Sequence, residues 1–322
     1  MNAIELQSVT KKFGERTVVD DVTLRVEQGE MFALVGPDGA GKTTTIRMLC
    51  GITAPTSGEL TVQGFDVRRH PEEVRKRIGY LSQKFSLYGD LTIDENIEFF
   101  AEIHGVREFK QRRNELLEFT RLTPFRMRLA EKLSGGMKQK LALACTLVHT
   151  PEVIFLDEPT TGVDPVSRRD FWKVLSSLLK TGITIVMTTP YLDEAERCSH
   201  VGLMNDGKLL MADTLRNMRK VMKGEIVELV CTNIRRSFSL LKRNNAVKEV
   251  QAFGDRLNLL VTDAKRDMPR IAAQLKDNNI DITEWRTIPP SLENIFISLL
   301  SETPPKDESV LTKKEREVAS TP

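Results

Sequence analysis

The chain lacks the features of a disulfide-stabilised, zinc-binding or membrane-spanning protein. Its four cysteines stand far apart, with no CxxC pair and no cluster with histidine. This pattern excludes a disulfide framework and a structural zinc site, and it favours a reducing compartment. Apolar runs such as Leu141–Val148 fall well short of the ~18 residues that a membrane helix needs. Because the N-terminal residues also lack the basic-then-apolar layout of a signal peptide, we expect a soluble cytoplasmic protein.

An excess of charge of one sign is also missing. The 47 Lys and Arg residues nearly balance the 45 Asp and Glu residues, and the net charge of +2 argues against a nucleic-acid partner. With 40% hydrophobic and 29% charged residues, the composition is that of a folded globular protein. The 322 residues are enough for two domains at roughly 100–200 residues each.

The first half of the sequence predicts an α/β fold with a parallel sheet. Short apolar runs alternate with amphipathic helical stretches, and some runs are apolar throughout, as in strands covered on both faces. These runs are Met31–Val35, Val153–Leu156 and Ile183–Met187. A further strand, Val201–Met204, leads into a hairpin turn at residues 205–208. Between about residues 84 and 150 the pattern is helical, which predicts a helical subdomain inserted in the α/β core.

A change of composition near residues 216–224 predicts a domain boundary, which we place at residue 218. Beyond it the order of elements is typical of a small α+β, ferredoxin-like βαββαβ domain with one more helix. The expected strands are 225–231, 247–253, 256–261 and 282–288, and the expected helices are 234–243, 268–276 and 292–300. We therefore predict domains at residues 1–218 and 219–301. Residues 302–322 are polar and charge-mixed, which predicts a disordered tail.

One motif matches a phosphate-binding loop. Residues 36–43 read GPDGAGKT, which fits G-x-x-x-x-G-K-[ST] between a predicted strand and a helix. Glycines allow backbone N–H groups to surround phosphate oxygens, Lys42 can reach the β- and γ-phosphates, and the Thr43 hydroxyl can bind Mg²⁺. The alternative is an ordinary glycine-rich turn. The predicted nucleotide-binding residues are Gly36, Pro37, Asp38, Gly39, Ala40, Gly41, Lys42, Thr43 and Thr44.

Two acidic residues follow a predicted buried strand. Asp157 and Glu158 come directly after the apolar run VIFL. In that position Asp157 would hold Mg²⁺ through water, and Glu158 would orient or deprotonate the attacking water. Alone, such a pair could also be a simple turn or a helix cap. The phosphate loop upstream favours the metal and catalytic roles.

A second loop also predicts an anion site. Its residues, here called the signature loop, are Leu133, Ser134, Gly135, Gly136 and Met137. A serine before two glycines can cap the following helix and leave N–H groups free for an anion. Since the helical insertion separates this loop from the phosphate loop, we expect a two-fold dimer in which each loop faces the other loop of the partner across a nucleotide. The alternative is a capped helix without a ligand.

Together these motifs resemble the ATP-binding cassette (ABC) ATPases over about residues 1–218. GPDGAGKTT, Gln83, LSGGM, VIFLDE and Asp164 occur in the order of that family. The resemblance implies an ABC-type P-loop nucleotide-binding domain that uses ATP and Mg²⁺. It also implies that Phe13 stacks on adenine; the alternative is that Phe13 is a packing residue. It further implies that Gln83 contacts Mg²⁺ and senses a membrane partner; the alternative is that Gln83 is a surface loop residue. By resemblance, the signature loop binds the γ-phosphate across the dimer, and Asp164 lies in the loop between the two sites.

Two positions depart from the family pattern. Asp38 stands where the family usually has Asn or Ser, and it places a carboxylate near an anionic ligand. Pro190 stands where the family usually has a histidine that contacts the γ-phosphate, and proline offers neither a donor nor a charge there. Either hydrolysis is slow at this site, or the chain works beside a better-equipped partner.

The C-terminal segment, residues 290–297, resembles the ending of ATPase subunits of drug exporters of the daunorubicin-resistance type. In that group the C-terminal part supports dimer contacts and regulation; a passive packing module is the alternative. The whole pattern predicts an ATPase subunit of a membrane exporter, peripheral on the cytoplasmic face. Its expected partners are separate transmembrane permease subunits and a second ABC subunit, identical or different. The alternatives are a soluble ABC ATPase on ribosomes or DNA and a hydrolysis-impaired regulatory subunit.

Overall fold

A computed structural model describes residues 1–84 and 87–302 and divides the chain into two compact units. The first unit is Met1–Leu215, and the second begins at Arg216. The boundary that we predicted at residue 218 falls within helix α8 (Leu215–Val221). Of the predicted disordered tail, residues 303–322 lie outside the described residues.

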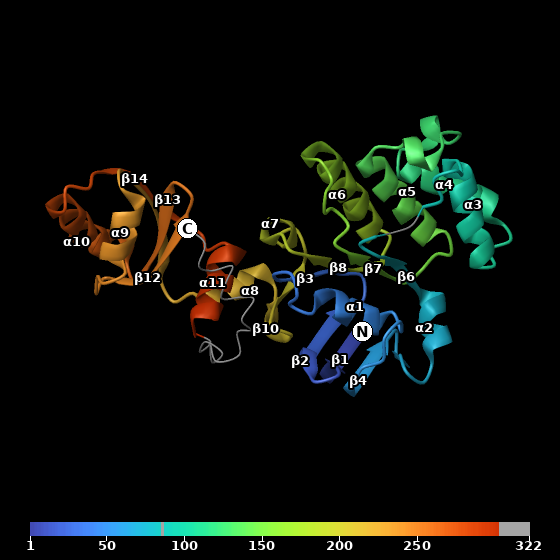
Figure 1. Cartoon of the computed structure of the whole chain (residues 1–322), viewed down its shortest axis with the longest axis horizontal. Helices are drawn as coiled ribbons and strands as arrows, with labels where there is room; N and C mark the ends of the chain where they lie inside the picture. Colours follow the sequence, from blue (N-terminus) through green and yellow to red (C-terminus); the bar gives the residue numbers. More distant parts are fainter. Residues whose placement is uncertain (85–86, 303–322) are drawn as a thin grey trace. The chain divides into compact units, whose positions relative to one another are not determined.

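The first unit contains an antiparallel sheet that the sequence analysis did not predict. Its strands pair in the order β2-β1-β4-β5. The bounds are β1 (Asn2–Phe13), β2 (Arg16–Glu27), β4 (Ser57–Val62) and β5 (Phe65–Asp66). The signal for β2 was present, since Val22, Leu24 and Val26 are buried and alternate with exposed residues, which is the period of a strand with one covered face. Figure 1 shows β1, β2 and β4 side by side.

The predicted parallel sheet forms the centre of the first unit, with strands in the order β10-β9-β3-β8-β7-β6. The bounds are β3 (Met31–Val35), β6 (Ile78–Leu81), β7 (Val153–Asp157), β8 (Thr184–Thr189), β9 (His200–Asn205) and β10 (Lys208–Asp213). All five residues of β3 and of β7 are buried, as in strands covered on both faces. The hairpin between β9 and β10 is present, and β8 extends two residues beyond its predicted end, to Thr189. This extension brings two threonines to the edge of the sheet that carries the site.

Helices complete the first unit. Those beside the sheets are α1 (Lys42–Leu49), α2 (Pro71–Arg77), α6 (Pro165–Leu179) and α7 (Leu192–Ala195). Those of the helical insertion are α3 (Ile93–Ile103), α4 (Phe109–Phe119) and α5 (Gly135–Leu147), with short 3₁₀ turns at residues 123–125 and 130–132. Figure 1 shows α3, α4 and α5 gathered as one group, coloured cyan to green. The α/β core with an inserted helical region is therefore as predicted.

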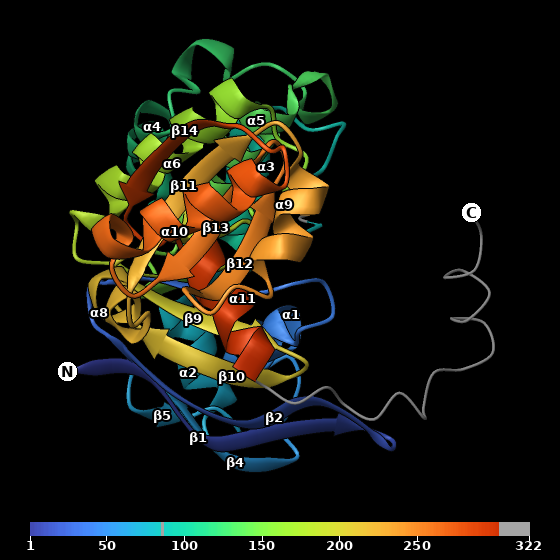
Figure 2. The same ribbon diagram turned by 90° about the vertical axis from the view of Figure 1, so that its left-hand side faces the viewer.

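The second unit is a ferredoxin-like domain, as predicted. Its elements are β11 (Glu225–Cys231), α9 (Ile234–Leu241), β12 (Val247–Phe253), β13 (Arg256–Val261), α10 (Ala264–Asp277), β14 (Ile282–Ile288) and α11 (Leu292–Glu302). The antiparallel strands lie in the order β12-β13-β11-β14, which Figure 2 shows face-on. Apolar residues of α9 and α10 share one core with the sheet. Helix α10 begins four residues before its predicted start, because the Asp263 side chain accepts from the Arg266 N–H at 2.9 Å and caps it.

Candidate nucleotide-binding site

The phosphate loop connects β3 to α1, and two of its glycines, Gly36 and Gly41, are required by close backbone contacts. A Cβ atom on Gly36 would lie 2.0 Å from the Met204 carbonyl oxygen. Gly41 has a φ of +100°, and a Cβ there would lie 2.6 Å from the Val18 carbonyl oxygen. Gly41 is also the N-cap of α1, and no described side chain caps the helix at that end. The first N–H groups of α1 are therefore available to an anion.

Lys42 is held inside the loop. Its side chain is buried, and its ammonium donates hydrogen bonds to the carbonyl oxygens of Gly36 at 2.8 Å and Pro37 at 3.0 Å. The same nitrogen lies 3.7 Å from Glu158 Oε1. The loop thus holds the Lys42 ammonium beside the Glu158 carboxylate at the N-terminus of α1. A phosphate group bound there would carry the charge opposite to that of Lys42.

Asp157 ends β7 with an incompletely satisfied carboxylate. The residue is 1% exposed, and its Oδ1 accepts from the hydroxyls of Thr43 at 2.9 Å and Thr188 at 2.6 Å. No described group donates a hydrogen bond to the buried Oδ2. A carboxylate and a hydroxyl oxygen are the donor set that Mg²⁺ prefers, and the orphaned Oδ2 fits a metal-bound water. Thr43 and Asp157 therefore fit the predicted magnesium site. The sequence analysis missed Thr188, although its polar side chain at the end of a strand was a usable signal.

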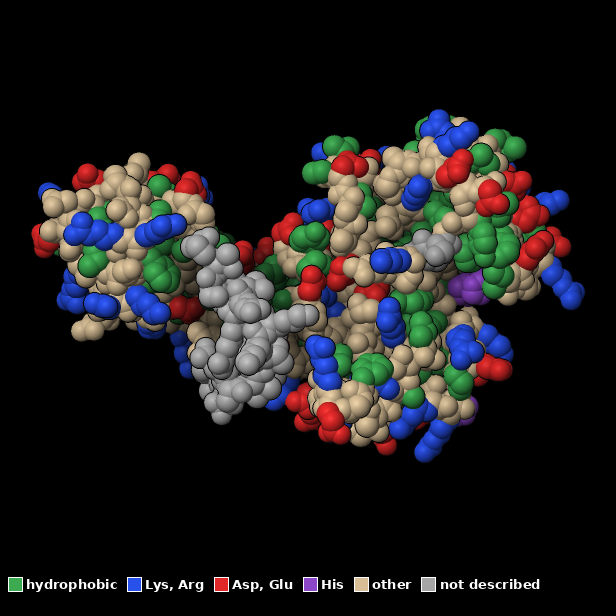
Figure 3. Space-filling view, viewed as in Figure 1, with side chains coloured by type: hydrophobic (Ala, Val, Ile, Leu, Met, Phe, Trp, Pro, Cys, Tyr) green, Lys and Arg blue, Asp and Glu red, His purple; other side chains and the backbone are tan. Residues whose placement is uncertain are grey.

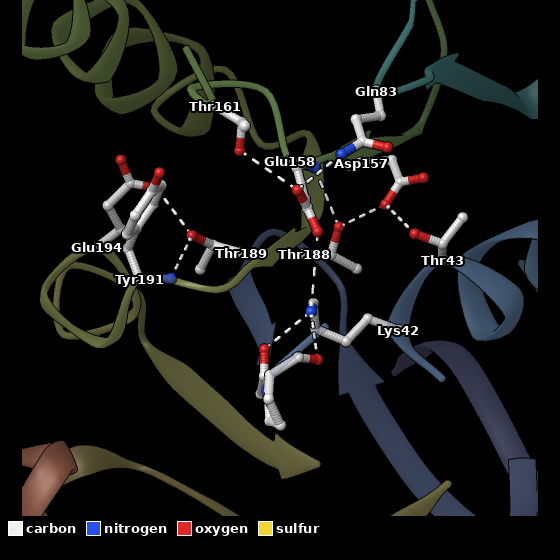
Figure 4. A network of polar contacts seen from close by, with 12 residues as sticks. Lys42, Thr43, Gln83, Asp157, Glu158, Thr161, Thr188, Thr189, Tyr191 and Glu194 are labelled. Carbon is white, nitrogen blue, oxygen red and sulfur yellow. Dashed lines mark hydrogen bonds and ion pairs between the residues drawn. The ribbon is translucent and has the colours of Figure 1, made fainter. Parts of the chain in front are cut away.

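Glu158 is fixed in an unusual backbone conformation. Its φ is +50°, in the left-handed region that non-glycine residues rarely adopt, and its N–H donates to Thr188 Oγ1 at 3.0 Å. The carboxylate Oε2 accepts from the Gln83 side-chain amide at 2.9 Å and from the Thr161 hydroxyl at 3.3 Å. Figure 4 shows these contacts together with Lys42 and Asp157. The strained residue and its donors hold one carboxylate oxygen in a set direction, as a general base requires.

These groups open into one pocket of about 760 Å³. Of the predicted site residues, it is lined by Phe13, Asp38, Gly39, Gly41, Lys42, Thr43, Thr44, Gln83 and Glu158. Phe13, at the end of β1, is 53% exposed, and the Lys11 ammonium lies 4.7 Å from its ring centroid. Stacking on a planar ligand would use the part of the ring that Lys11 leaves exposed. Pro190 and Tyr191 also line the pocket. Of these two, the sequence analysis had singled out only Pro190.

The signature loop lies elsewhere on the first unit. Within the described residues, none of its members lines the pocket. Ser134 caps α5, accepting from the Met137 N–H at 3.4 Å, so the helix begins at Gly135, directly after it. Gly135 faces open space, whereas a Cβ on Gly136 would lie 2.3 Å from Cβ of Ser167 in α6. Leu133 is buried. One glycine is therefore free for a ligand, and the other allows two helices to touch.

Asp164 caps α6 next to this contact. Its carboxylate accepts from the N–H groups of Val166 at 3.1 Å and Ser167 at 3.0 Å. The hydrogen bonds from Ser167 lower the pKa of Asp164 below its usual value. The start of α6 is thus fixed both by its own cap and by the contact between Ser167 and the signature loop.

The described residues contain neither a candidate membrane span nor a cluster of metal-ligating side chains. Over residues 1–84 and 87–302, no helix combines the length and apolar character needed to cross a membrane. Over the same residues, no group of three or more His, Cys, Asp or Glu side chains is arranged to hold a metal ion.

Two family models match the chain. The model described as ABC transporter matches residues 19–161, and the model described as ATP-binding protein DrrA1-3-like, C-terminal domain, matches residues 214–300. The probable multidrug ABC transporter ATP-binding protein YbhF of Escherichia coli (strain K12) is 44% identical over 213 residues, 66% of this chain and 37% of that protein. The chain thus spans little more than a third of YbhF. The daunorubicin resistance ATP-binding protein DrrA2 of Streptomyces coeruleorubidus is 34% identical over 304 residues, which cover 92% of this chain and 94% of that protein.

Solved structures agree on the first unit. An ATP-binding subunit of an ABC transporter aligns with a TM-score of 0.62 at 30% identity, over 68% of this chain and 92% of that chain. A dimeric ATP-binding cassette, MJ0796, in a post-hydrolysis state with ADP and Pi, aligns with a TM-score of 0.60 at 28% identity, over 66% of this chain and 99% of that chain. The two family models together match residues of both compact units, 19–161 in the first and 214–300 almost entirely in the second.

Proposed function

Since the chain belongs to the ABC transporter family of ATP-binding proteins, we propose that it is the ATP-hydrolysing subunit of a membrane exporter. The observation that carries this proposal is the meeting of Lys42, Thr43 and Glu158 at one pocket, with the buried Asp157 carboxylate bonded to the Thr43 hydroxyl directly behind it. The multidrug, daunorubicin and linearmycin resistance proteins among the relatives support export as the process that is powered.

Each residue of the pocket has a part in this proposal. The N–H groups at the start of α1 and the Lys42 ammonium bind the β- and γ-phosphates, and Phe13 stacks on the adenine. Thr43 and Asp157 hold Mg²⁺ with its waters, with Gln83 beside them; when bound, the ion neutralises charge on the phosphate oxygens. Glu158 accepts the proton of the attacking water, and the Gln83 amide that donates to Glu158 Oε2 keeps the carboxylate in place.

The site is completed by a second copy or a related cassette. Within one chain the signature loop does not line the pocket among the described residues. The capped start of α5, with Gly135 open, leaves N–H groups for the γ-phosphate bound to the partner chain. Closure of two chains on two nucleotides then provides the movement that drives transport. By its resemblance to the daunorubicin-resistance type, the second unit supports the contacts of the dimer or regulates it.

Transmembrane permease subunits are the proposed partners, with the chain on the cytoplasmic face of the membrane. A mainly apolar pocket of about 280 Å³ lies between the sheet and the helical insertion, with Ile52, Tyr80, Phe100 and His104 among its lining residues. Ile52 is 58% exposed, which suits contact with an apolar helix of the permease. Figure 3 shows hydrophobic side chains exposed beside a histidine on this side of the helical insertion. Ile52→Glu should therefore lower the fraction of the chain that sediments with vesicles containing the permease.

The test of the ATPase proposal is the Glu158→Gln variant. We expect its steady-state ATPase to fall at least roughly 100-fold, the usual contribution of a general base, while ATP binding is kept and ATP-bound dimers accumulate in gel filtration. Glu59→Gln, an exposed carboxylate on β4, is the control and should keep wild-type turnover. Unchanged turnover in Glu158→Gln would remove Glu158 from the mechanism. A variant that stays monomeric with saturating Mg-ATP, alone and mixed with candidate partner cassettes, would remove the shared site.

A further inference from the structure

A buried carboxylate outside the phosphate-binding groups connects two segments of the site. Glu194, in α7, is 1% exposed. It accepts from the Thr160 hydroxyl at 2.7 and 2.8 Å and from the Thr189 hydroxyl at 3.0 Å. Thr160 belongs to the loop that follows Glu158, and Thr189 is the last residue of β8. The Glu194 carboxylate therefore connects the loop that follows Glu158 to the end of β8.

Arg168 supplies the compensating charge. Its Nε lies 3.4 Å from Glu194 Oε1, in an ion pair whose carboxylate partner is almost fully buried. Burying a carboxylate is costly unless an opposite charge and hydrogen bonds accompany it. Arg168 comes from the first turn of α6, where its N–H donates to the Asp164 carbonyl oxygen at 2.9 Å. The ion pair thus also joins α6 to the loop and the strand.

Tyr191 connects Arg168 and Glu194 to the nucleotide pocket. The Arg168 guanidinium lies 5.0 Å from the centroid of the Tyr191 ring, within the range of a cation–π contact. The Tyr191 N–H donates to Thr189 Oγ1 at 3.0 Å, and Figure 4 shows Tyr191, Thr189 and Glu194 in one network. Tyr191 lines the pocket beside Pro190. Its backbone is held through Thr189, and its ring is covered by Arg168.

We propose that Arg168 and Glu194 are a positioning pair for ATP hydrolysis, which holds the Tyr191 ring against the nucleotide pocket and keeps the loop after Glu158 in place. The inference rests on the proposed ATPase function and adds three residues to it. Neither Arg168 nor Glu194 lines the pocket among its described lining residues, so both act through Tyr191 and Thr160. When reacting groups are slightly misplaced, the reaction rate falls more than the affinity for the substrate. The pair should therefore govern kcat and leave KM for ATP nearly unchanged.

The experiment compares full-length variants by steady-state kinetics. Arg168→Gln should lower kcat about tenfold with KM for ATP changed less than about twofold. Arg169→Gln, the exposed neighbour on α6, is the matched control and should behave as wild type. Because the proposed contact with Tyr191 is made by the ring, Tyr191→Phe should keep most of the turnover, whereas Tyr191→Ala should lose about as much as Arg168→Gln. Glu194→Gln should resemble Arg168→Gln, and the double variant should be little worse than either single variant.

Thermal melting without nucleotide separates positioning from folding. Under the proposal, Arg168→Gln and Tyr191→Ala lose turnover at temperatures where both remain folded. Wild-type kcat in Arg168→Gln, an equal loss in Arg169→Gln, or a loss in Tyr191→Phe as large as in Tyr191→Ala would overturn it. So would a loss of turnover that is matched by unfolding at the assay temperature. No turnover in the wild-type chain, alone or with its partners, would overturn the ATPase function itself, and this inference with it.

Discussion

The two compact units differ in how their buried ionisable side chains are grouped. In the first unit, ionisable groups are buried at one edge of the parallel sheet, where Lys42 and Glu158 line the pocket and Asp157 lies behind Thr43. In the second unit, the buried Asp267 carboxylate is paired with the exposed Arg266 at 2.8 Å, and neutral amides hold α11 against the sheet, since the Asn294 amide donates to Gln251 Oε1 at 2.6 Å. A charged group is far more costly to bury than an amide. Gathered ionisable groups therefore mark the unit that binds a charged ligand, and paired amides mark a packing contact.

The largest effect is expected on removing the buried charge of Lys42 in the first unit. Lys42→Met keeps the aliphatic volume and removes the charge, so ATP affinity should fall roughly 100-fold, because hydrogen bonds to charged groups contribute up to about 3 kcal/mol. The measurement is titration with a fluorescent ATP analogue. Lys180→Met, at an exposed position after α6, should bind as wild type does. Equal affinity in Lys42→Met and wild type would mean that the buried cation does not bind phosphate.

Two glycines of the phosphate loop should separate crowding from backbone strain. Gly36→Ala places a methyl group 2.0 Å from a carbonyl oxygen, and we expect a loss of about 3 kcal/mol in the free energy of unfolding. At Gly39, with a φ of +80°, a Cβ would meet no atom within 4 Å, so Gly39→Ala should cost only about 1 kcal/mol. Urea denaturation measures both variants. The reverse order would contradict the described path of the loop.

A change in the second unit should leave the nucleotide site intact. Asn294→Ala leaves Gln251 without its donor and should lower the stability of the second unit by roughly 1–3 kcal/mol. ATP affinity should be unchanged, because none of the described pocket residues belongs to the second unit. Hydrogen exchange followed by peptide mapping reads the loss in residues 225–301. A matching loss of ATP affinity would show that the two units are coupled.

Pro190→His tests the departure from the family pattern. A histidine at this wall of the pocket would add a donor beside the γ-phosphate. We expect steady-state turnover to rise a few-fold, with little change in ATP affinity. Turnover equal to that of wild type would show that residue 190 does not limit the rate.

The smallest expected effect is a pH dependence of stability. Burial lowers the pKa of His149 below its usual value of 6.5, and its ring stacks on His104 with the centroids 4.0 Å apart. Below pH 6.5 the unfolded chain then binds more protons than the folded chain, so the free energy of unfolding should fall as the pH is lowered. Urea midpoints at pH 7.5 and pH 5.5 measure this. His149→Gln should show a weaker dependence between the two values, and an unchanged dependence would refute the assignment.

Sequence patterns predicted local elements better than contacts between distant segments. The bounds of β3, β11, β12, β13 and β14 coincide with the predicted ones, because each strand is a short run bounded by turn residues. The antiparallel sheet of β1, β2, β4 and β5 was not predicted, because β2 is not apolar throughout and instead shows the alternation of a strand with one covered face.

The motifs of the site could also be found in the sequence, but their supports could not. Lys42, Asp157 and Glu158 belong to short patterns whose chemistry is known. Thr188 lies beside Asp157 because β8 pairs with β7, and Tyr191 and Glu194 contact Arg168 of α6. Such contacts join residues about 30 positions apart, and nothing in the local sequence specifies them.

The touching of Gly136 and Ser167 has a mechanical consequence. With no room for even one methyl group between them, the first turn of α5 and the first turn of α6 have little freedom to slide separately. When one turn is displaced, the other is carried along. A side chain added at residue 136 would therefore push α5 and α6 apart. It would change how the two helices move relative to one another even in the absence of a ligand.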